Sequence, residues 1–516
     1  MTTLAQIPNN TRAVCPPGDR LTSTDAIDGQ GTDKDRKMLD FMLNGQRYQL
    51  GDIAPEATVL NVLRTRLMQC GTKEGCASGD CGACTVAIGE TTQQGVRYSS
   101  ANACITPAHQ LQGRQLITVE GLAAGKSLHP VQQAMVEHHG SQCGFCTPGI
   151  VMSLFCLYHN HTGDQPPSDA AIAASLGGNL CRCTGYRPIR EAARHMMTST
   201  GHIPTFLTRT AEDRLRQNDD GPYRQPTSLI ALKHALRDMA AARLVAGGTD
   251  LMLETTLKLE RFEQLIDVSR VAELLEVEET TDGWWIGAAV TYSRLEPLLA
   301  PHYPSVAELL ERLGSRQIRN RGTLGGNIAN ASPIGDTPPV LLALDATVKL
   351  DGIDGERTLP LDDFFIDYKR TALKKGEFIR AIWLPRPGSE QRLHVWKLSK
   401  RREDDISALL MAIRYRLEAG VLRNVRLAFG GMAATPKRAL ATERALEGSR
   451  LDTATLDAAR AALSEDFDPI DDVRASRGYR LEAAGNLLER LHWQLTRPDT
   501  RIPTTLLEAS EHAHLD

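Results

Sequence analysis

The stretch Gly75-Cys-Ala-Ser-Gly-Asp-Cys-Gly-Ala-Cys84 decides how the first part of this chain must fold. It has the spacing Cys76-x4-Cys81-x2-Cys84, and Cys104 follows after nineteen intervening residues. The glycines let a tight loop turn inward, so that thiolates and backbone N–H groups converge on inorganic sulfur. This spacing is typical of a plant-type two-iron two-sulfur cluster, whereas structural zinc sites favour paired short spacings. The sequence therefore predicts an iron–sulfur cluster at these four cysteines.

Four further cysteines form two short pairs, Cys143-x2-Cys146 and Cys181-x1-Cys183, which are 34 residues apart. Taken alone, such pairs fit zinc about as well as iron–sulfur. The neighbouring cluster motif favours iron–sulfur here. Each pair precedes a predicted helix, one beginning near Thr147 and one at Pro188, so we expect two interhelical loops to meet at one cofactor.

The other cysteines lack such a pattern. Ten of the eleven cysteines lie between Cys70 and Cys183, and the 333 residues after Cys183 contain none. The polar start of the chain, 1–37, has no apolar signal core, so clustered thiols indicate metal or redox work rather than disulfides. We expect Cys15 to be an ordinary thiol, and Cys70 and Cys156 to be packed thiols on or near apolar helical faces.

Composition limits the class of protein. The 516 residues predict three or four domains, and 41% hydrophobic with 24% charged residues is ordinary for globular proteins. The 59 Lys plus Arg and 63 Asp plus Glu give a net charge of −4, which lacks the basic surplus that nucleic-acid binding requires. Since no apolar run is long enough to cross a bilayer, we also expect no membrane association and a cytoplasmic location.

Local patterns predict a small α/β domain followed by helices. Met38–Leu43 and Arg47–Leu50 are expected to be strands joined by a type I′ turn at Asn44-Gly45, and Thr58 is expected to cap a helix that reaches Met68. Further along, apolar periodicity predicts four helices, around 131–138, around 150–157, after Ser168, and from Pro188. Later segments alternate between strands, at 244–246, 265–268 and 284–287, and helices, at 306–313 and 340–344. Strands dominate 395–429, and helices are expected at 456–463 and 480–495.

Two glycine-rich turns follow apolar segments, Leu244-Val-Ala-Gly-Gly-Thr-Asp-Leu251 and Gly322-Thr-Leu-Gly-Gly-Asn327. Turns of this kind let backbone N–H groups approach a pyrophosphate without interference from Cβ atoms. Each turn alone fits a tight turn without a ligand equally well. Neither turn has the G-x-G-x-x-G pattern, so the sequence does not indicate a Rossmann nucleotide site.

Four motifs carry a family resemblance: the 75–84 stretch, Asn102-Ala-Cys104, Gln142-Cys-Gly-Phe-Cys-Thr-Pro-Gly149 and Asn179-Leu-Cys-Arg-Cys-Thr-Gly-Tyr-Arg-Pro188. In this order they resemble the paired cluster domains of the molybdenum hydroxylases, the xanthine dehydrogenase family. The two glycine-rich turns that follow resemble the FAD-binding domain of that family and of carbon monoxide dehydrogenase flavoproteins. Carbon monoxide dehydrogenase itself fits less well, because there cluster and flavin domains occupy separate chains.

The resemblance implies a multidomain α+β protein. We expect a flexible extension at 1–36, a plant-type ferredoxin-like α/β domain at 37–120, a four-helix two-iron two-sulfur domain at 121–200, a linker at 201–222, an α+β FAD-binding domain of the non-Rossmann type at 223–394, and a C-terminal α+β flavoprotein domain at 395–510.

The resemblance also implies the site residues. The cluster ligands would be Cys76, Cys81, Cys84 and Cys104 in one set and Cys143, Cys146, Cys181 and Cys183 in the other. The FAD contacts would be Leu244, Val245, Ala246, Gly247, Gly248, Thr249, Asp250, Leu251, Leu313, Thr323, Leu324, Gly325, Gly326, Asn327, Asp336, Ile379 and Lys397. At Leu313 some relatives carry phenylalanine. The run Ser399–Asp405 resembles a mobile loop that influences whether NAD or oxygen takes electrons, although a solvated turn is the alternative.

Because the chain stops at Asp516, we expect the small subunit, with the iron–sulfur clusters and FAD, of a split bacterial xanthine dehydrogenase. Its implied partner is a molybdopterin-binding large subunit, in a heterotetramer of two small and two large subunits. That partner would oxidise hypoxanthine to xanthine and urate, and this chain, with no catalytic residue of its own, would pass electrons through two clusters and FAD to NAD. The alternatives are the equivalent chain of another molybdenum hydroxylase, acting on an aldehyde or N-heterocycle, or a free-standing NAD-linked iron–sulfur flavoprotein.

Overall fold

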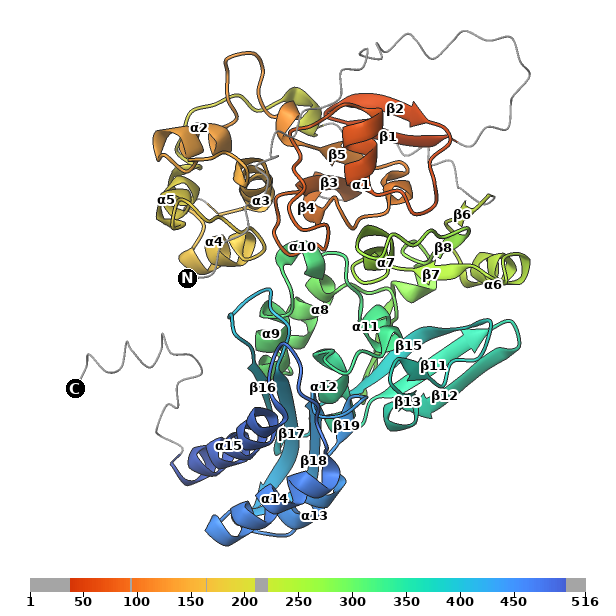
Figure 1. Cartoon of the computed structure of the whole chain (residues 1–516), viewed down its shortest axis with the longest axis vertical. Helices are drawn as coiled ribbons and strands as arrows, with labels where there is room; N and C mark the ends of the chain where they lie inside the picture. The colour runs from red at the N-terminus through yellow and green to blue at the C-terminus, as the bar shows by residue number, and fades with distance from the viewer. Residues whose placement is uncertain (1–37, 93–94, 164, 209–220, 498–516) are drawn as a thin grey trace, which may run out of the picture. The chain divides into compact units, whose positions relative to one another are not determined.

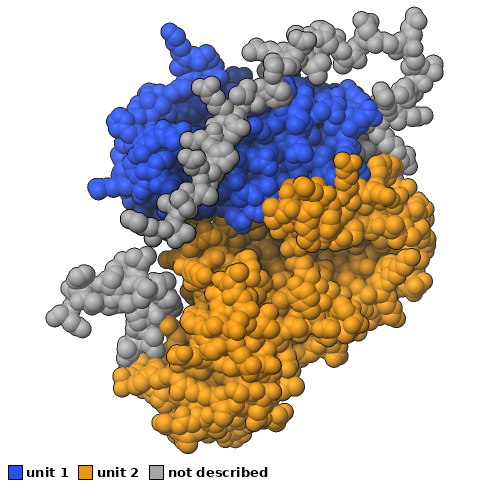
Figure 2. All heavy atoms as spheres, in the orientation of Figure 1, with its two compact units in different colours: residues 1–172, 179–215 blue, residues 173–178, 216–516 orange. Residues whose placement is uncertain are grey.

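A computed structural model of the chain describes residues 38–92, 95–163, 165–208 and 221–497 (Figure 1). The chain divides into two compact units, residues 1–172 with 179–215 and residues 173–178 with 216–516 (Figure 2). The expected extension at 1–36 and Cys15 lie outside the described residues, as does 209–220 of the expected linker. Among the described residues, no helix combines the length and apolar character needed to cross a membrane.

A five-stranded mixed sheet organises the first unit, in the order β2-β1-β5-β3-β4. Its strands are β1 Leu39–Leu43, β2 Gln46–Leu50, β3 Thr85–Thr92, β4 Gly95–Asn102 and β5 Gln115–Ile117. The predicted hairpin between β1 and β2 is present, and Asn44 and Gly45 both have positive φ, 50° and 82°, as a type I′ turn requires. β1 also pairs in parallel with β5, which makes the sheet mixed.

The predicted helix after Thr58 is present but irregular. The Thr58 hydroxyl accepts a hydrogen bond from Asn61 N–H at 3.1 Å, which caps α1 Val59–Asn61. The next turn, Val62–Arg66, is a π-helix. Val59, Leu60 and Leu63 are buried, so the apolar periodicity identified the buried face although the hydrogen-bond pattern is not α-helical.

All four predicted helices follow the sheet. They are α2 Pro130–Glu137, α3 Thr147–Asn160, α4 Asp169–Leu176 and α5 Arg187–His195. The Ser168 hydroxyl accepts from Ala171 N–H at 3.2 Å, as expected of a cap. α2 packs against α3 and α5. After α5, a 3₁₀ turn at Thr205–Thr208 returns to the sheet, where the Leu207 carbonyl accepts a hydrogen bond from Tyr98 Oη at 2.8 Å.

The prediction of packed thiols is wrong for one of the two cysteines. Cys156 is a free and buried thiol on α3. Cys70 is disulfide-bonded and only partly buried, so it is neither free nor a core thiol. The prediction failed because it used apolar helical periodicity, and the chain at Cys70 has already left the helix, which ends near Leu67.

The second unit begins with a parallel three-stranded sheet in the order β6-β8-β7, formed by β6 Tyr223–Arg224, β7 Arg243–Val245 and β8 Leu265–Asp267. Helices α6 Leu229–Asp238 and α7 Met252–Thr256 connect its strands.

An antiparallel sheet follows, in the order β12-β11-β15-β10-β9. Its strands are β9 Val277–Glu279, β10 Gly283–Gly287, β11 Thr347–Gly352, β12 Gly355–Pro360 and β15 Glu377–Pro385, and a hairpin of β13 Phe365–Asp367 and β14 Arg370–Thr371 lies between β12 and β15 in the sequence. Of these seven later strands, the sequence predicted only β10.

A last antiparallel sheet has the order β16-β17-β18-β19, with β16 Gln391–Leu398, β17 Leu409–Glu418, β18 Val421–Gly430 and β19 Lys437–Arg438. Alternate residues of β17 enter different cores, because side chains of a strand point to opposite faces. Leu409, Met411 and Ile413 pack with residues of the helices α13 Leu440–Leu446, α14 Thr453–Asp466 and α15 Arg477–Thr496. Leu410 and Ala412 belong to the core that contains residues of α8 Tyr292–Leu299, α9 Pro304–Glu311, α11 Leu324–Asn330 and α12 Thr337–Ala343. The short helix α10 Arg316–Arg319 lies between α9 and α11 in the sequence.

Candidate iron–sulfur and flavin sites

Strand pairing places two cysteines of the first thiol set. β3 and β4 are antiparallel, and Thr85 pairs with Asn102. Cys84 immediately precedes β3 and Cys104 follows β4, so the end of the hairpin brings them together. Their Sγ atoms are 3.3 Å apart, and both residues are buried.

The 75–84 loop brings the other two thiols of this set inward. The backbone N–H groups of Ser78 and Cys81 donate to Cys76 Sγ, each at 3.4 Å. Cys76 also shares hydrogen bonds with the thiols of Cys81 and Cys104. A Cβ atom on Gly75 would lie 2.8 Å from Cys81 Sγ, so glycine is required for this approach. The structure therefore links the four predicted residues of the first set through pairwise contacts, Cys84 with Cys104 and Cys76 with both Cys81 and Cys104.

The close approach of these thiols affects their ionisation. The pKa of Cys76 is lowered, mainly by a hydrogen bond from Cys104, and the pKa of Cys104 is raised by the same interaction. The neighbouring thiols cannot all ionise at once without a compensating positive charge. A cationic iron centre bound by four thiolates supplies that charge, so the residues present fit an iron–sulfur cluster.

The second thiol set lies in the loops before α3 and α5. Cys143 Sγ and Cys183 Sγ are 3.5 Å apart, and Cys146 hydrogen-bonds to Cys181. Burial and the Cys181 interaction raise the pKa of Cys146 to about 12. Burial opposes ionisation of Cys181 as well, yet hydrogen bonds from Thr184 and Cys146 bring its pKa down to about 7.

The two thiol sets differ in exposure. Cys143 and Cys183 are exposed, whereas Cys84 and Cys104 are fully inside the protein. Within the described residues, no three His, Cys, Asp or Glu side chains are grouped as they would be around a single bound ion. Four thiols at the spacing and loop geometry of each set fit a cluster better than a mononuclear metal.

The two glycine-rich turns meet in the second unit. The first turn connects β7 to α7, and the carbonyl of Gly247 accepts a hydrogen bond from Arg321 Nε at 3.2 Å. A Cβ atom on Gly247 would lie 1.9 Å from the Arg321 carbonyl oxygen, and Gly248 has a φ of +79°. Both positions therefore require glycine, and the requirement at Gly247 comes from contact between the two turns.

The second turn forms the start of α11. Thr323 caps the helix by accepting a hydrogen bond from Gly326 N–H at 3.0 Å. A Cβ atom on Gly325 would lie 2.5 Å from the Cβ atom of Ala288, so α11 packs closely on the chain after β10. The Asn327 side chain accepts from the Thr337 hydroxyl at 2.7 Å. These contacts place the two glycine-rich turns next to each other, and turns of this kind can present backbone N–H groups to an anion.

The four isolated flavin candidates fall into two groups. Asp336 and Lys397 form a buried ion pair, with Oδ2 and Nζ 2.6 Å apart. Leu313 and Ile379 pack into the core that contains α8, α9 and α12.

Sequence reasoning missed two arginines beside these residues. Arg319 is 3% exposed and donates to the carbonyls of Glu311 and Gly314 at 3.0 and 2.9 Å, which fixes the chain on both sides of Leu313. Arg312 donates to the carbonyls of Lys397 and Arg402 at 3.2 and 3.3 Å. Neither arginine belongs to a motif, so no local signal identified them.

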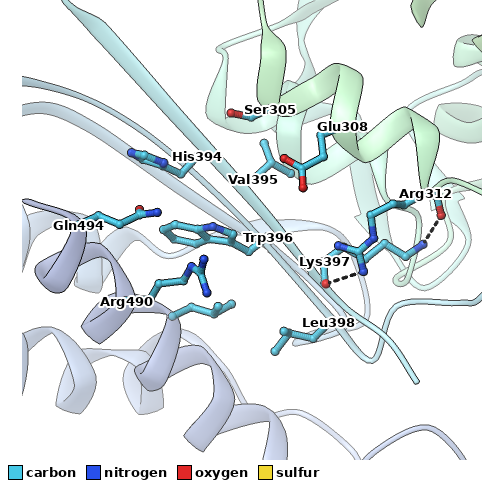
Figure 3. A pocket seen from close by; sticks show the side chains of 11 residues that line it. Ser305, Glu308, Arg312, His394, Val395, Trp396, Lys397, Leu398, Arg490 and Gln494 are labelled. Carbon is cyan, nitrogen blue, oxygen red and sulfur yellow. Dashed lines mark hydrogen bonds between the residues drawn. The ribbon is translucent and has the colours of Figure 1, made fainter. Parts of the chain in front are cut away.

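A cavity of about 200 Å³ opens between α9, β16 and α15 (Figure 3). Trp396, Arg490 and Gln494 line one side, and Glu308 and Arg312 line the other. Neither glycine-rich turn contributes to the lining. We therefore do not assign this cavity to FAD.

The predicted charged loop 399–405 folds on itself. Arg401 Nη2 donates to the Asp404 carbonyl at 2.7 Å, and Arg401 N–H donates to Asp405 Oδ2 at 2.8 Å. The loop is joined to the end of α9 through Arg312. The Arg401 and Arg402 side chains remain exposed.

The thiol sets and the paired glycine turns define an iron–sulfur flavoprotein of the oxidoreductase class. Family models support this: residues 118–194 match a 2Fe-2S binding domain, residues 216–387 match the FAD binding domain in molybdopterin dehydrogenase, and residues 394–495 match the CO dehydrogenase flavoprotein C-terminal domain.

Comparisons with individual proteins indicate the same family. The chain is 33% identical over 481 residues to a xanthine dehydrogenase of Drosophila pseudoobscura pseudoobscura, a match that covers 80% of this chain and 36% of that one. A solved carbon monoxide dehydrogenase chain from Hydrogenophaga pseudoflava is 30% identical with a TM-score of 0.50, over 52% of this chain and 95% of that chain. A quinoline 2-oxidoreductase chain from Pseudomonas putida 86 is 27% identical with a TM-score of 0.50, over 54% and 98%.

The chain belongs to the molybdenum hydroxylase family. The matched domains support iron–sulfur and FAD cofactors for this chain and a role in electron transfer. The chain spans about a third of the length of the xanthine dehydrogenases that it matches.

Proposed function

We propose that this chain is the small subunit, with the iron–sulfur clusters and FAD, of a bacterial xanthine dehydrogenase and passes electrons from purine hydroxylation to NAD. The observation that carries the proposal is the pairing of thiols within two separate sets of cysteines, Cys84 with Cys104 and Cys143 with Cys183, on a chain that also contains a molybdopterin-dehydrogenase FAD domain. When bound, two-iron two-sulfur clusters accept and release electrons, and FAD can hand on electrons as a hydride.

The residues of this chain bind and tune these groups. Cys76, Cys81, Cys84 and Cys104 hold the first cluster, and Cys143, Cys146, Cys181 and Cys183 hold the second. The backbone N–H groups of Ser78 and Cys81 stabilise thiolate at Cys76. The turns at 244–251 and 323–327 bind the FAD diphosphate, and Asp336, Lys397, Leu313 and Ile379 contact FAD. The expected domain boundaries are part of the same proposal.

The partner is a chain that carries molybdopterin, in a heterotetramer of two copies of each. About half of the present chain matches 95% of one chain of the carbon monoxide dehydrogenase relative. This match supports a division of the family's cofactors among several chains. Purine specificity then lies on the partner. NAD as acceptor and a cytoplasmic location are inferred from resemblance to xanthine dehydrogenases.

A second candidate is the corresponding chain of a hydroxylase for another N-heterocycle. The quinoline 2-oxidoreductase chain, 27% identical over 54% of this chain, favours it. An activity assay of the chain with its co-purified partner distinguishes the two candidates. Only a xanthine dehydrogenase forms urate from xanthine with reduction of NAD.

Cofactor content tests the proposal directly. Purified chain should contain about four irons, two per cluster, one FAD and no stoichiometric zinc. Electron paramagnetic resonance (EPR) should show two centres after reduction, and Cys146→Ser should remove only one. Purine turnover should require the partner. Stoichiometric zinc, or urate formation by the isolated chain, would contradict the proposal.

A further inference from the structure

A backbone hydrogen bond joins the loops of the two thiol sets within the first unit. Leu180 N–H donates to the carbonyl oxygen of Cys81 at 3.0 Å. Cys81 belongs to the first set, and Leu180 is the residue before Cys181 of the second. The path between the Cys81 and Cys181 thiols therefore consists of covalent bonds and this one hydrogen bond.

Three buried groups hold this contact in place. The Asn179 side chain donates to the carbonyl of Gly82 at 3.1 Å and accepts from the Ser153 hydroxyl of α3 at 2.6 Å. Gly149, in the first turn of α3, approaches the same carbonyl so closely that a Cβ atom would lie 2.1 Å from its oxygen. The loops of both thiol sets and α3 are thus tied to one peptide segment, Cys81–Gly82.

Phe145 adds a side-chain contact to the same junction. It lies between Cys143 and Cys146, and its ring reaches the first set, where a Cβ atom on Gly75 would lie 3.4 Å from its Cε1 atom and 2.8 Å from Cys81 Sγ. The ring is 47% exposed although it is large and apolar. A ring in this position keeps water from one side of the junction, and the exclusion of solvent changes the reduction potential of a metal centre.

We propose that the Leu180–Cys81 hydrogen bond is the route for single electrons between the two clusters, and that Phe145 is a positioning residue that shields this route. The inference rests on the proposed function, because it requires both clusters. In each transfer one cluster is oxidised by one electron and the other is reduced by one electron. No proton moves and no covalent bond changes.

Two substitutions at one position isolate the hydrogen bond. Leu180→Ala keeps the backbone N–H, whereas Leu180→Pro removes it, and both remove the leucine side chain. We expect transfer between the clusters to be unchanged in Leu180→Ala and slower in Leu180→Pro, by roughly the 10-fold to 100-fold that the loss of an outer-shell partner costs in activity at metal sites. This transfer is measured by rapid-freeze EPR after the full chain is mixed with reduced methyl viologen. The reductant contacts the exposed second thiol set first.

Phe145 supplies an independent measurement if Leu180→Pro fails to assemble both clusters. Phe145→Ala should shift the reduction potential of the first cluster without loss of iron, Phe145→Leu should restore it, and Val136→Ala, another exposed apolar position, should leave it unchanged. Wild-type transfer rates in Leu180→Pro with both clusters present would overturn the route. An unchanged potential in Phe145→Ala would overturn the shielding role. Absence of two clusters in the wild-type chain would instead refute the proposed function.

Discussion

Lys397 Nζ lies 2.6 Å from Asp336 Oδ2, and the two side chains are only 2% and 8% exposed. The residues are 61 positions apart in the sequence, and they meet because β16 packs beside the segment that leads into α12. The Ser407 hydroxyl donates to the other carboxylate oxygen of Asp336, and the Arg312 carbonyl accepts from Lys397 Nζ at 3.3 Å. A buried ion pair with these additional partners is costly to break from one side.

The first prediction concerns this pair. Lys397→Met leaves the Asp336 carboxylate buried without its cation, so the free energy of unfolding of the second unit should fall by about 3–5 kcal/mol. The double variant Lys397→Met, Asp336→Leu should recover part of that loss, because no unpaired charge remains. Urea denaturation followed by tryptophan fluorescence measures both variants.

A partly exposed pair provides the control. Lys349 and Glu356 are 3.6 Å apart and their side chains are 25% and 39% exposed. Lys349→Met should therefore change stability by no more than about 1 kcal/mol. Equal losses at Lys397 and Lys349 would mean that the buried pair is not a special contributor to the unit.

Glycine at position 247 provides the second prediction. A Cβ atom there would overlap the Arg321 carbonyl oxygen at 1.9 Å, so Gly247→Ala must separate the two glycine-rich turns. We expect loss of bound FAD, measured by flavin absorbance after gel filtration. Gly478→Ala is the matched control, because a Cβ atom there meets nothing within 4 Å and the position lies in α15. It should keep FAD and stabilise the helix by up to about 1 kcal/mol. Retention of FAD in Gly247→Ala would remove the turn from the proposed site.

Features that depend on neighbours in the sequence were predictable. The Asn44-Gly45 hairpin, the caps at Thr58 and Ser168, and the helices after the second thiol set follow from residue type and short spacing. The cysteine sets were predictable for a similar reason, since the spacing of each loop limits how its thiols can converge. The π-helical turn after α1 could not be predicted, because the apolar spacing is nearly the same for both helix types.

Features that depend on tertiary contacts were not predictable. The bond from Asn179 to Gly82 joins residues 97 positions apart, and Arg319 reaches carbonyls of a preceding helix end. Strand β11 pairs with β15 across an inserted hairpin, which period-2 patterning cannot indicate. Nothing in the local sequence around Cys70 distinguished a disulfide from a packed thiol.

The charged loop gives the third prediction, which rests on the proposal that NAD is the acceptor. Arg402 is exposed, and it accepts the hydrogen bond from Arg312 through its backbone carbonyl, which alanine keeps. Arg402→Ala should therefore alter the local field within about 8–10 Å at physiological salt. The ratio of NAD-dependent to oxygen-dependent turnover in the complete complex should change, with FAD content and both cluster spectra unchanged. Arg401→Ala also removes the hydrogen bond to the Asp404 carbonyl and should have a larger effect. If both variants keep the wild-type ratio at low and moderate salt, the loop is only a solvated turn.

The last prediction concerns a histidine pair in the first unit. His129 Nε2 and His159 Nε2 are 3.0 Å apart, and His129 Nδ1 accepts a hydrogen bond from Val131 N–H at 3.3 Å. Neutral His129 therefore carries its proton on Nε2 and donates it to His159. Burial, together with the charges of His159 and His202, lowers the pKa of His129 to about 3, and burial lowers the pKa of His159 to about 4.

These lowered pKa values determine the direction of the pH effect. Below about pH 6.5 the unfolded chain takes up protons at both histidines, whereas the folded chain does not until about pH 4. The stability of the first unit should therefore be constant above pH 7 and should fall as the pH drops from about 6.5 towards 4, by up to about 1.4 kcal/mol per pH unit for each histidine. His159→Gln keeps an acceptor for His129 but does not titrate, so it should reduce this slope by about half. Urea unfolding between pH 5 and pH 7.5 measures the slope, and equal slopes in the wild type and His159→Gln would show that His159 does not contribute.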